Sequence, residues 1–595
     1  MCGLIGAVIP DWSPDRLRHF CQEGLDTLAH RGPDGAGVTG DDGWILGHRR
    51  LSIIDLASGG QPMTNKKHNV SITFNGEIVN YRQLRRELIG YGLDFKTESD
   101  TEVVLNAYIV WGSDCLSHFD GMYAFAIYSE KTNTLFCARD PLGIKPLFTT
   151  QIDGGVAFAS EIRALYAGGE INFRPADQNF VEFLVYGDVS GSGTLHKGID
   201  ELPAGHCAHF HDETWTVERF WYPSSSAAIA NRSESVLVGE LSERIETTVK
   251  NWTVSDVPIA AFLSGGVDSG LVSTFAASQL MDLTLLTAYF PEYDYPDERR
   301  LAAMVAEQTQ STHIEMAVHS DAIGESLTEL VEVFGDPLHD SNSMTYMFLC
   351  RALREASDAK VVLTGDGADE LFAGYVRHHQ IATAYTQSPD PELIMLAKNK
   401  IAFERLQLFC SDLEIVNQTR EEAARGLRSS DPLGKVLEMD QLFFLPAYLR
   451  RQDHIAMQFG LEARPPFLDH HLVEYINALP TKSFYRYRDG VHWRKYLLRC
   501  VAERHLPKRL VWNPVEVQFS LPADRMFDEG GPLRSLALDL LTKDAKLGNW
   551  YVPAGMLELL DRHDSTTQAT NHTNTLFRLL TLEIWLRSMS GASAS

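Results

Sequence analysis

The sequence predicts a chain of two to four domains whose C-terminal half is an α/β fold with a doubly wound parallel sheet. Its 595 residues are enough for several sizeable hydrophobic cores. Beyond about residue 240, short apolar runs of strand length alternate with stretches of helical periodicity. Two of these runs lead into glycine-rich loops, and such sheets bind their ligands at the carboxyl ends of the strands. We therefore expect both loops to face one site.

The first glycine-rich loop reads Ser264-Gly265-Gly266-Val267-Asp268-Ser269 and follows an apolar run at 259–263. Its glycines let the backbone approach an oxyanion, its serine hydroxyls add donors, and the N-terminus of the next helix adds free N–H groups. Asp268 has the wrong charge to hold phosphate, but it can bind a Mg²⁺ ion that the phosphates carry. The loop is not of the Walker type, because no G-x-x-x-x-G-K-[ST] run occurs in the chain.

The other elements of the C-terminal half follow the same alternation. We expect strands at 283–290, 313–318 and 361–363, and a helix at 298–309. The last strand leads into the acidic loop Thr364-Gly365-Asp366-Gly367-Ala368-Asp369-Glu370. Its carboxylates would repel a nucleotide unless a divalent cation lay between them and the phosphates. The two loops together predict a site for a phosphate-bearing ligand and Mg²⁺.

Bulk properties argue against several classes of protein. A formal charge of −26 without a basic stripe disfavours nucleic acid as the main partner. No apolar run reaches the ~18–20 residues of a membrane span, and the N-terminus lacks the basic region of a signal peptide. The 8 cysteines include no C-x-x-C pair, which favours a reducing cytoplasm. The histidine pairs 378–379 and 470–471 have no third ligand at a convincing spacing, so we interpret them as ordinary core or solvated residues.

Cys2 directly follows the initiator methionine. If Met1 is removed, Cys2 carries both a thiol and a free α-amine, whose pKa of about 7.7–8.0 leaves a large fraction neutral. The amine can then accept the thiol proton, directly or through a water, and generate a thiolate nucleophile. A cysteine at this position alone is better explained by chance, so the prediction depends on the motifs that follow.

Several polar motifs follow Cys2 in order along the chain. They are His30–Asp34, His48–Asp55, Phe74–Ile78, Ser99–Glu102, Ala138–Gly143, Phe158–Glu161 and Leu202–His206. Together with Cys2, they resemble the class II glutamine amidotransferase domain over about residues 2–210. That domain is an N-terminal-nucleophile hydrolase, and the resemblance implies a four-layer αββα sandwich.

The same resemblance assigns roles to five further residues. It implies that Arg50 pairs with the α-carboxylate of glutamine, a task that suits the guanidinium fork. Glu77 and Asp100 hold the α-ammonium group of glutamine. Asn75 and the Gly76 N–H form the oxyanion hole for the tetrahedral intermediate.

The motifs of the C-terminal half extend the resemblance. Residues 264–269 look like the PP-loop of ATP pyrophosphatases, which split ATP into AMP and pyrophosphate. With the segments 365–375, 460–469 and 494–499, nearly the whole chain resembles the glutamine-dependent asparagine synthetase family. The resemblance implies a nucleotide site formed by Leu263, Ser264, Gly265, Gly266, Asp268, Ser269, Ala288, Thr364 and Gly365.

The resemblance also implies how the acceptor is activated. Asp268 and Asp369 hold Mg²⁺ and pyrophosphate, Lys495 contacts the phosphates, and Asp366 contributes to formation of the acyl-adenylate. Members of the family carry Glu or Asp at this last position. Adenylation gives a carboxylate a good leaving group, and ammonia released inside the protein stays neutral until it attacks. We therefore expect two sites joined by a dry passage.

The implied reaction converts ATP, L-aspartate and L-glutamine into L-asparagine, L-glutamate, AMP and pyrophosphate through β-aspartyl-AMP and channelled ammonia. The chain departs from aspartate amidators at two places: Ser341 stands where an arginine is expected, and Asn513–Glu516 replaces a basic run. The alternative is therefore an enzyme that amidates another carboxylic acid, such as a natural-product intermediate, by the same mechanism. A stand-alone glutamine hydrolase would not need the two glycine-rich loops, and a β-lactam synthetase-like cyclase would not need an intact glutaminase site. A non-catalytic scaffold would have no need to retain either set of groups.

The sequence also predicts the domain organisation. We expect the glutaminase domain at 2–212, a linker of small polar residues at 213–235, the synthetase domain at 236–587 and a disordered tail at 588–595. A helix from about Val236 to Asn251 is expected to lead to the first glycine-rich loop. The expected partners are the small-molecule substrates, and a homodimer is a candidate assembly.

Overall fold

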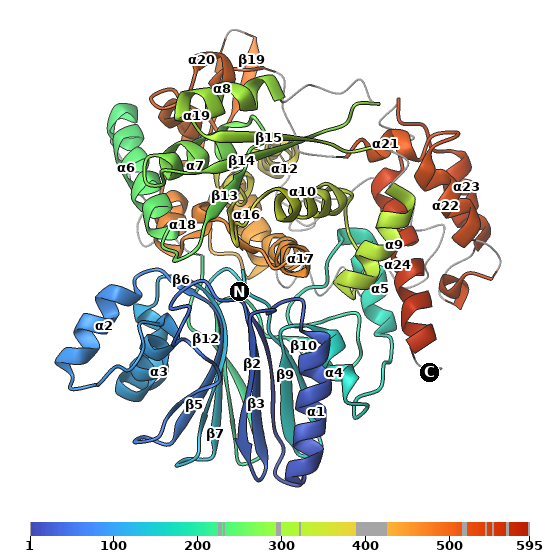
Figure 1. The fold of residues 1–595 in the computed structure, drawn as a ribbon. Helices are drawn as coiled ribbons and strands as arrows, with labels where there is room; N and C mark the ends of the chain where they lie inside the picture. Colours follow the sequence, from blue (N-terminus) through green and yellow to red (C-terminus); the bar gives the residue numbers. More distant parts are fainter. Residues whose placement is uncertain are drawn as a thin grey trace.

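The computed structural model describes the whole chain except residues 1, 224–228, 230–231, 293–298, 320–322, 388–424, 489, 515–520, 542–543, 550–552, 567–570 and 593–595. Its N-terminal part contains two packed antiparallel sheets, and its C-terminal part is built around a parallel sheet (Figure 1). None of the helices in the described part of the chain combines the length and the apolar character that crossing a bilayer requires.

The first antiparallel sheet has the strand order β10-β8-β9-β1-β3-β2. Its strands are β1 (Gly3–Val8), β2 (Gly35–Asp41), β3 (Trp44–Arg50), β8 (Phe148–Ile152), β9 (Gly155–Ala159) and β10 (Asp200–Glu201). Ile5 of β1 packs with the residues of helix α1 (Pro14–Thr27), whereas Leu4 packs with residues of the second sheet. Burial on both faces explains why β1 is apolar throughout instead of alternating.

The second antiparallel sheet has the order β12-β11-β7-β6-β5-β4. Its strands are β4 (Met63–Asn65), β5 (Val70–Ile78), β6 (Gly121–Ser129), β7 (Thr134–Arg139), β11 (His206–His211) and β12 (Thr214–Arg219). Helices α2 (Tyr81–Gly90) and α3 (Asp100–Trp111) cover its outer face, while α1 and α4 (Ile162–Ala167) cover the other sheet. These four layers confirm the predicted αββα sandwich. Residues 214–219, which we expected in the linker, instead pair with β11 as the edge strand β12.

The C-terminal sheet is parallel and has the order β15-β14-β13-β16-β17. Its strands are β13 (Ile259–Phe262), β14 (Thr284–Tyr289), β15 (Thr312–Ala317), β16 (Val361–Leu363) and β17 (Glu462–Arg464). Ala261 packs with residues of α6 (Glu234–Trp252), α7 (Val267–Ala277) and α8 (Arg299–Thr309). Phe262 packs with α9 (Ile323–Phe334), α10 (Asn342–Ala356) and α17 (Leu445–Gln458). The predicted doubly wound sheet and its four predicted strands are confirmed, whereas β17 was not anticipated.

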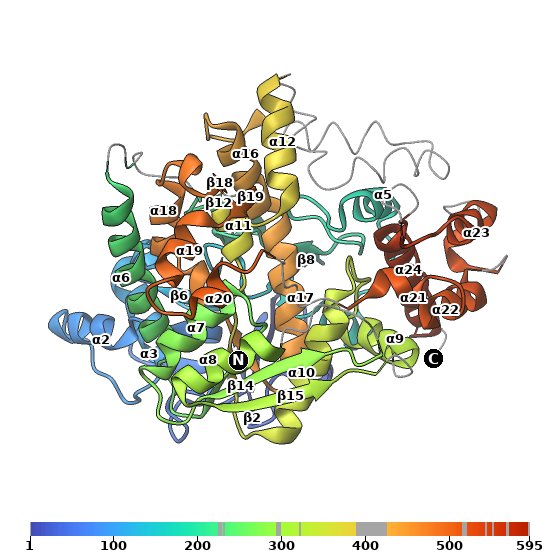
Figure 2. The same cartoon turned by 90° about the horizontal axis from the view of Figure 1, so that it is seen from above.

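Further helices and a hairpin surround this sheet, and α21 to α24 form a group at one side of it (Figure 2). Their bounds are η1 (Gly112–His118), α5 (Asp177–Tyr186), α11 (Ala368–Phe372), α12 (Val376–Gln387), α16 (Pro432–Met439), η4 (Asp440–Phe444), η5 (Pro466–Leu468), α18 (His470–Asn477), η6 (Thr481–Ser483), β18 (Tyr485–Arg488), β19 (Val491–Arg494), α19 (Tyr496–Ala502), α20 (Lys508–Val511), α21 (Ala523–Met526), α22 (Pro532–Leu540), η7 (Lys546–Asn549), α23 (Pro553–Asp561) and α24 (Thr573–Ala592).

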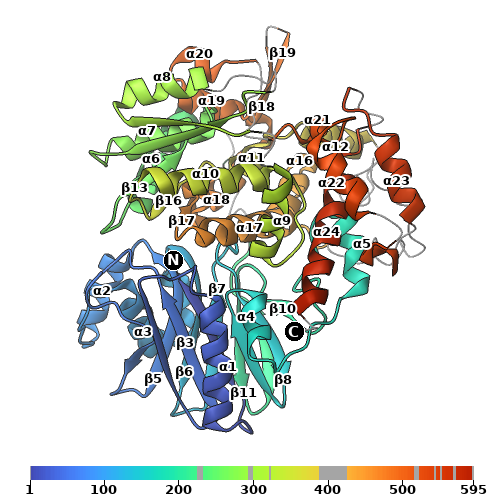
Figure 3. The same cartoon turned by 45° about the vertical axis from the view of Figure 1, so that its right-hand side comes forward.

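Helix α24 corrects the prediction of a disordered tail, and it packs against a helix from the N-terminal half of the chain. It continues to Ala592 because Met589 still packs against the hydrophobic core, so residues 588–592 are helical and not disordered. The last residues of the predicted tail, 593–595, lie outside the described part. Helix α5, which belongs to the N-terminal part of the chain, packs beside α24 in the same core (Figure 3). The two halves of the chain are therefore interleaved here.

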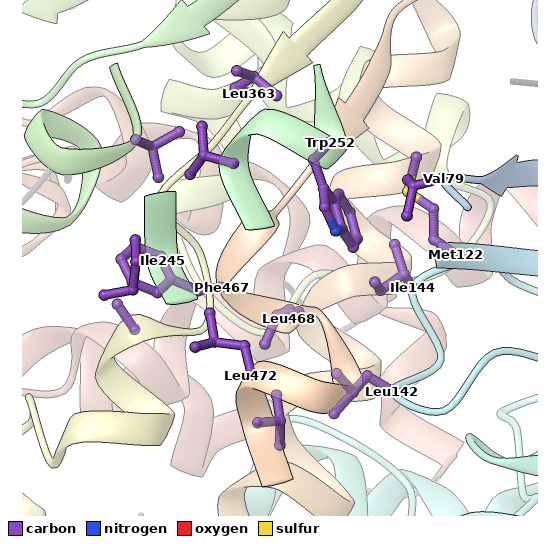
Figure 4. Packing of buried hydrophobic residues seen from close by; sticks show 14 of the residues in the cluster. Val79, Met122, Leu142, Ile144, Ile245, Trp252, Leu363, Phe467, Leu468 and Leu472 are labelled. Atoms are coloured by element: carbon purple, nitrogen blue, oxygen red, sulfur yellow. The ribbon is translucent and has the colours of Figure 1, made fainter. Parts of the chain in front are cut away.

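The two halves also share a continuous hydrophobic core. Figure 4 shows Trp252 at the end of α6 among apolar side chains from both halves: Val79, Met122, Leu142 and Ile144 from the N-terminal half, and Phe467, Leu468 and Leu472 from the C-terminal half. Trp252 is completely buried, and a large aromatic ring in such a position contributes strongly to the stability of an interface. This shared core fixes the position of one half relative to the other.

Candidate active site

The N-terminus of the chain lies at the junction of the two halves (Figure 1), and Cys2 directly precedes β1. Its backbone nitrogen donates to Asn75 Oδ1 at 2.9 Å, and its carbonyl oxygen accepts from Arg31 Nε at 3.1 Å. Burial raises the pKa of the Cys2 thiol, while the charge of Arg50 acts in the opposite direction. A thiol in this position needs a nearby proton acceptor, and the same backbone nitrogen would be a free amine in a chain that begins at Cys2.

Asn75 and Gly76 lie side by side on β5. Asn75 is completely buried, and its Nδ2 has no hydrogen-bond partner among the described residues. A buried amide donor without a partner is costly, so its presence beside Cys2 favours a role in binding a ligand oxygen. Gly76 packs against β6 so closely that a β-carbon there would lie 2.2 Å from the Met122 carbonyl oxygen. This geometry suits the predicted oxyanion hole.

A small cavity brings most of the predicted glutamine site together. Its lining includes Cys2, Arg50, Gly76, Glu77 and Asp100. The guanidinium group of Arg50 is held in place because its Nη2 donates to the carbonyl oxygens of Ile54 and Asp55, at 3.0 and 2.6 Å. Residues from three separate motifs of the sequence therefore converge on one hollow beside the thiol.

The two predicted acidic ligands in this cavity have different surroundings. Asp100 accepts hydrogen bonds from the amides of Ile78 and Thr101, and burial raises its pKa to about 6. Glu77 Oε2 pairs with Arg464 Nη2 of β17 at 3.0 Å, a partner that the sequence did not reveal. The other carboxylate oxygen of Glu77, Oε1, has no hydrogen-bond partner among the described residues. One oxygen of Glu77 is therefore left to contact a ligand.

Replacing Asn75 with alanine should lower kcat for glutamine hydrolysis by about 10²–10³-fold, the usual loss when one oxyanion donor is removed. Steady-state assays of glutamate release would measure it, with ammonia-dependent activity as the check on folding. Asn65→Ala is the matched control, because Asn65 lies on the neighbouring strand β4 and contacts Asn106 instead of Cys2. An unchanged kcat for Asn75→Ala would contradict the oxyanion assignment.

The second site lies at the carboxyl ends of the parallel strands, as predicted. Ser264 and Ser269 close the first loop, since the Ser269 hydroxyl accepts from the Ser264 amide at 3.1 Å. Gly265 has a φ of +73°, a conformation that favours glycine. The second loop lies against the first: a β-carbon on Gly365 would be 2.8 Å from the Ser269 nitrogen. The glycines at these positions are therefore required for the two loops to meet.

Both loops border a cavity of about 530 Å³. Its lining includes the predicted residues Ser264, Gly265, Gly266, Asp268, Ser269, Thr364, Gly365, Asp366, Asp369 and Lys495. Leu263 and Ala288 were also predicted to line the nucleotide site, but they are buried next to the cavity and are not part of its wall. Leu263 directly precedes the loop, and its carbonyl oxygen accepts a hydrogen bond from the hydroxyl of Thr287.

Lys495 lies between two of the predicted metal ligands. Its Nζ is 2.5 Å from Asp268 Oδ2 and 2.7 Å from Asp369 Oδ1. Burial lowers the pKa of Lys495, but the two carboxylates outweigh this effect and raise the pKa, so the side chain is charged. Gly374 makes the approach possible, because a β-carbon there would overlap Asp369 and the end of the lysine side chain.

Several residues of this cavity were missed by the sequence analysis. Tyr448 donates to Asp366 Oδ1 at 2.9 Å, and Arg451 forms an ion pair with Asp340. Glu370, already identified in the sequence as part of the acidic loop, lies in the same cavity wall, where burial raises its pKa to about 8 and the charge of Asp369 acts in the same direction. Tyr448 and Arg451 come from the helical segment before the G-L-E-A-R-P-P motif, where neither composition nor spacing distinguishes them from ordinary helix residues.

Helix α17 connects the two sites. Tyr448 and Arg451 on this helix border the large cavity. Two residues beyond Arg451, Asp453 Oδ2 accepts from Arg31 Nη2 at 2.7 Å. Arg31 in turn holds the carbonyl of Cys2 through its Nε. One helix therefore contacts the predicted adenylation site and, through a single arginine, the predicted nucleophile of the other half.

The sequence matches family models in both halves. Residues 1–221 match the glutamine amidotransferase domain, and residues 240–587 match asparagine synthase. A Bacillus subtilis protein described as asparagine synthetase (glutamine-hydrolyzing) 3 is 32% identical over 538 residues, or 86% of each chain.

Two other relatives are more distant. A putative asparagine synthetase (glutamine-hydrolyzing) of Mycobacterium tuberculosis is 29% identical over 615 residues, covering 94% of this chain and 92% of the relative. The Penicillium rubens protein named amidase chyE is 28% identical over 608 residues, covering 89% and 88%. With both family models matched and the two sites formed in one molecule, the chain belongs to the glutamine-hydrolysing asparagine synthetase family.

Proposed function

We propose that this protein is a glutamine-dependent ligase that adenylates L-aspartate with ATP and converts it to L-asparagine. The observation that carries the proposal is the pairing of two complete sets of groups in one chain. A buried N-terminal thiol with an unpaired amide donor lies in one half, and two glycine-rich loops with acidic and basic groups border a cavity in the other. Helix α17 contacts both.

In the first half, the thiol of Cys2 attacks the side-chain carbonyl of glutamine, and the N-terminal amine takes up the thiol proton. Asn75 Nδ2 and the Gly76 amide stabilise the oxyanion that develops. Arg50 and Asp100 border the same cavity and orient the α-carboxylate and α-ammonium groups of glutamine. Ammonia leaves, and water hydrolyses the remaining thioester to glutamate.

In the second half, the groups present suit a divalent cation beside ATP. The charged Lys495 amine lies between Asp268 and Asp369, the place where a cation would be shared by two carboxylates. Asp268 Oδ1 is buried and has no hydrogen-bond partner among the described residues. Asp268 and Asp369 would hold Mg²⁺, and the bound ion would offset the negative charge of the pyrophosphate leaving group. The loop serines and amides would hold the phosphates, and Lys495 would move from the carboxylates towards them.

The ammonia must reach the adenylate without becoming ammonium in bulk water. The shared core between the halves supports this requirement, because Met122, Leu142, Ile144 and Leu468 exclude water from much of the interface (Figure 4). The passage itself remains a prediction, as do the cytoplasmic location and the homodimer. The amount of free ammonia released during turnover should be compared with the amount of amide formed. A small ratio would mean that ammonia passes from glutamine hydrolysis to amide synthesis without escaping.

The surroundings of the cavity favour an amino acid as the acceptor. Ser341 brings no cation to the cavity, but Arg451 of α17 borders it and supplies a guanidinium group there. Asp340 borders the same cavity and pairs with Arg451. A cation and an anion side by side suit the carboxylate and ammonium groups of a zwitterion. The second departure, Asn513–Glu516, is described only to residue 514, and Asn513 lies in the cavity wall.

Replacing Arg451 with glutamine should raise the KM for aspartate by about 30-fold or more, since loss of one partner of a carboxylate contact costs about 2–5 kcal/mol. The KM for ATP should change little. Arg450→Gln is the matched control, because Arg450 pairs with Glu201 at 3.0 Å and does not border the cavity. Equal effects of the two variants would mean that Arg451 does not bind the acceptor.

The second candidate is amidation of a different carboxylic acid by the same acyl-adenylate route. Two observations support this second candidate: the similarity to a protein named amidase chyE, and the serine at position 341 where an arginine is expected. Pyrophosphate release should be measured at fixed glutamine and ATP with aspartate, succinate and larger carboxylic acids. Saturation by aspartate with asparagine as product excludes the second candidate. No turnover with aspartate excludes the first.

A further inference from the structure

Two adjacent histidines meet a carboxylate from the other half of the chain. His470 and His471 begin helix α18, and Asp120 directly precedes β6, some 350 residues earlier. His471 Nε2 is 3.0 Å from Asp120 Oδ1, and His470 Nε2 is 3.9 Å from the same oxygen. One ligand atom from each of the three residues lies within 4.8 Å of the other two. The third ligand that sequence spacing did not reveal is therefore supplied by the fold.

These three side chains are held by rigid surroundings. The Asp120 amide donates to Asn80 Oδ1 at 3.2 Å, and its carbonyl accepts from the Val79 amide at 2.8 Å. On the other side, Asp469 caps α18 and accepts from the buried Trp252 side chain at 3.3 Å. The cluster thus lies at the edge of the hydrophobic core that joins the two halves, where α18 faces the start of β6 (Figure 1).

The cluster is accessible from solvent and is not fully used by other contacts. The side chains of His471 and Asp120 are 61% and 29% exposed, so an ion can enter. The Nδ1 of His470 is buried and has no hydrogen-bond partner among the described residues. The partial positive charge at the start of α18 disfavours a cation, but the carboxylates of Asp469 and Glu474 act against it. Neither is needed as a ligand.

Two imidazoles and one carboxylate are a donor set for a borderline divalent metal. Zn²⁺ and its neighbours in the transition series bind imidazole nitrogen well, whereas Mg²⁺ prefers oxygen ligands. Among the residues that the structure describes, this is the one group of at least three histidine, cysteine or acidic side chains whose ligand atoms converge in this way. We propose that Asp120, His470 and His471 bind Zn²⁺ or a similar divalent transition metal, with water completing the coordination. The bound metal would link the two halves of the chain.

The test is a zinc titration of the full-length protein after treatment with a chelator, followed by equilibrium dialysis and metal analysis. The wild type should bind one more Zn²⁺ than either Asp120→Asn or His471→Gln, or should bind it at least about tenfold more tightly. Zn²⁺ should also raise the Tm of the wild type more than that of the variants, because it bridges two parts of the fold. The wild type and the variants share Cys2 and the acidic loops. Zinc bound at those places is therefore the same in all of them and does not affect the difference.

His19→Gln is the matched control, since His19 forms an exposed pair with Glu23 at 3.9 Å without a second histidine. This variant should bind zinc as the wild type does. Equal zinc binding by the wild type, Asp120→Asn and His471→Gln would overturn the proposal and leave a simple ion pair between His471 and Asp120. Loss of zinc in the His19 variant as well would overturn it too, because it would indicate nonspecific binding to surface histidines.

Discussion

The Cys2→Ala variant is expected to lose glutamine-dependent amide formation by at least about 10³-fold, because removal of a catalytic nucleophile leaves only binding and oxyanion stabilisation. Added ammonium salt should still support synthesis at a rate close to that of the wild type. The reason is spatial: Cys2 borders the small cavity, whereas the glycine-rich loops and Lys495 border the large one. Parallel assays of amide product with glutamine or ammonia as the nitrogen source would measure both effects.

The matched control for this variant is Cys21→Ala. Cys21 is buried in α1, where desolvation raises the pKa of its thiol to about 12, so it cannot serve as a nucleophile near neutral pH. Its replacement should leave both nitrogen sources usable. If Cys2→Ala lost ammonia-dependent synthesis to the same degree as glutamine-dependent synthesis, Cys2 would not be a nucleophile that serves the glutamine reaction alone.

Local sequence patterns were sufficient for the elements that carry the loops. The apolar run at 259–263 and the helical spacing after Ser269 correctly placed β13 and α7, because strand and helix periodicities are properties of neighbouring residues. The Ser99 side chain accepts a hydrogen bond from the Thr101 amide and caps α3, the usual role of a serine that directly precedes a helix. Short elements were harder to predict. Strand β17 has only three residues, too few for a periodic pattern, and it forms because it pairs with β16.

Contacts between distant segments could not be predicted from one sequence. Asp453 and Arg31 are 422 residues apart, and no motif or periodic pattern in the sequence links the two residues. The same holds for Glu77 and Arg464, a buried pair that crosses between the halves. Motif resemblance grouped most of the residues that border each cavity, but the partners that hold them come from packing. This explains why Arg451 and Asp120 were missed, since each pairs with a residue from a distant segment, Arg451 with Asp340 and Asp120 with His471.

Replacing Asp268 with asparagine is expected to slow adenylation by at least about 10²-fold, since it removes a charged ligand beside the phosphates and a partner of Lys495. Exchange of labelled pyrophosphate into ATP in the presence of the acceptor would measure this step. Glutamine hydrolysis should persist, because Asp268 lies outside the cavity of Cys2, and its persistence shows that the variant is folded.

Asp282→Asn is the matched control, since this exposed residue precedes β14 at the amino end of the sheet and away from the loops. It should exchange pyrophosphate as the wild type does. Wild-type exchange by Asp268→Asn would instead show that the phosphates and their cation are held by Asp369 and the loop amides without this carboxylate.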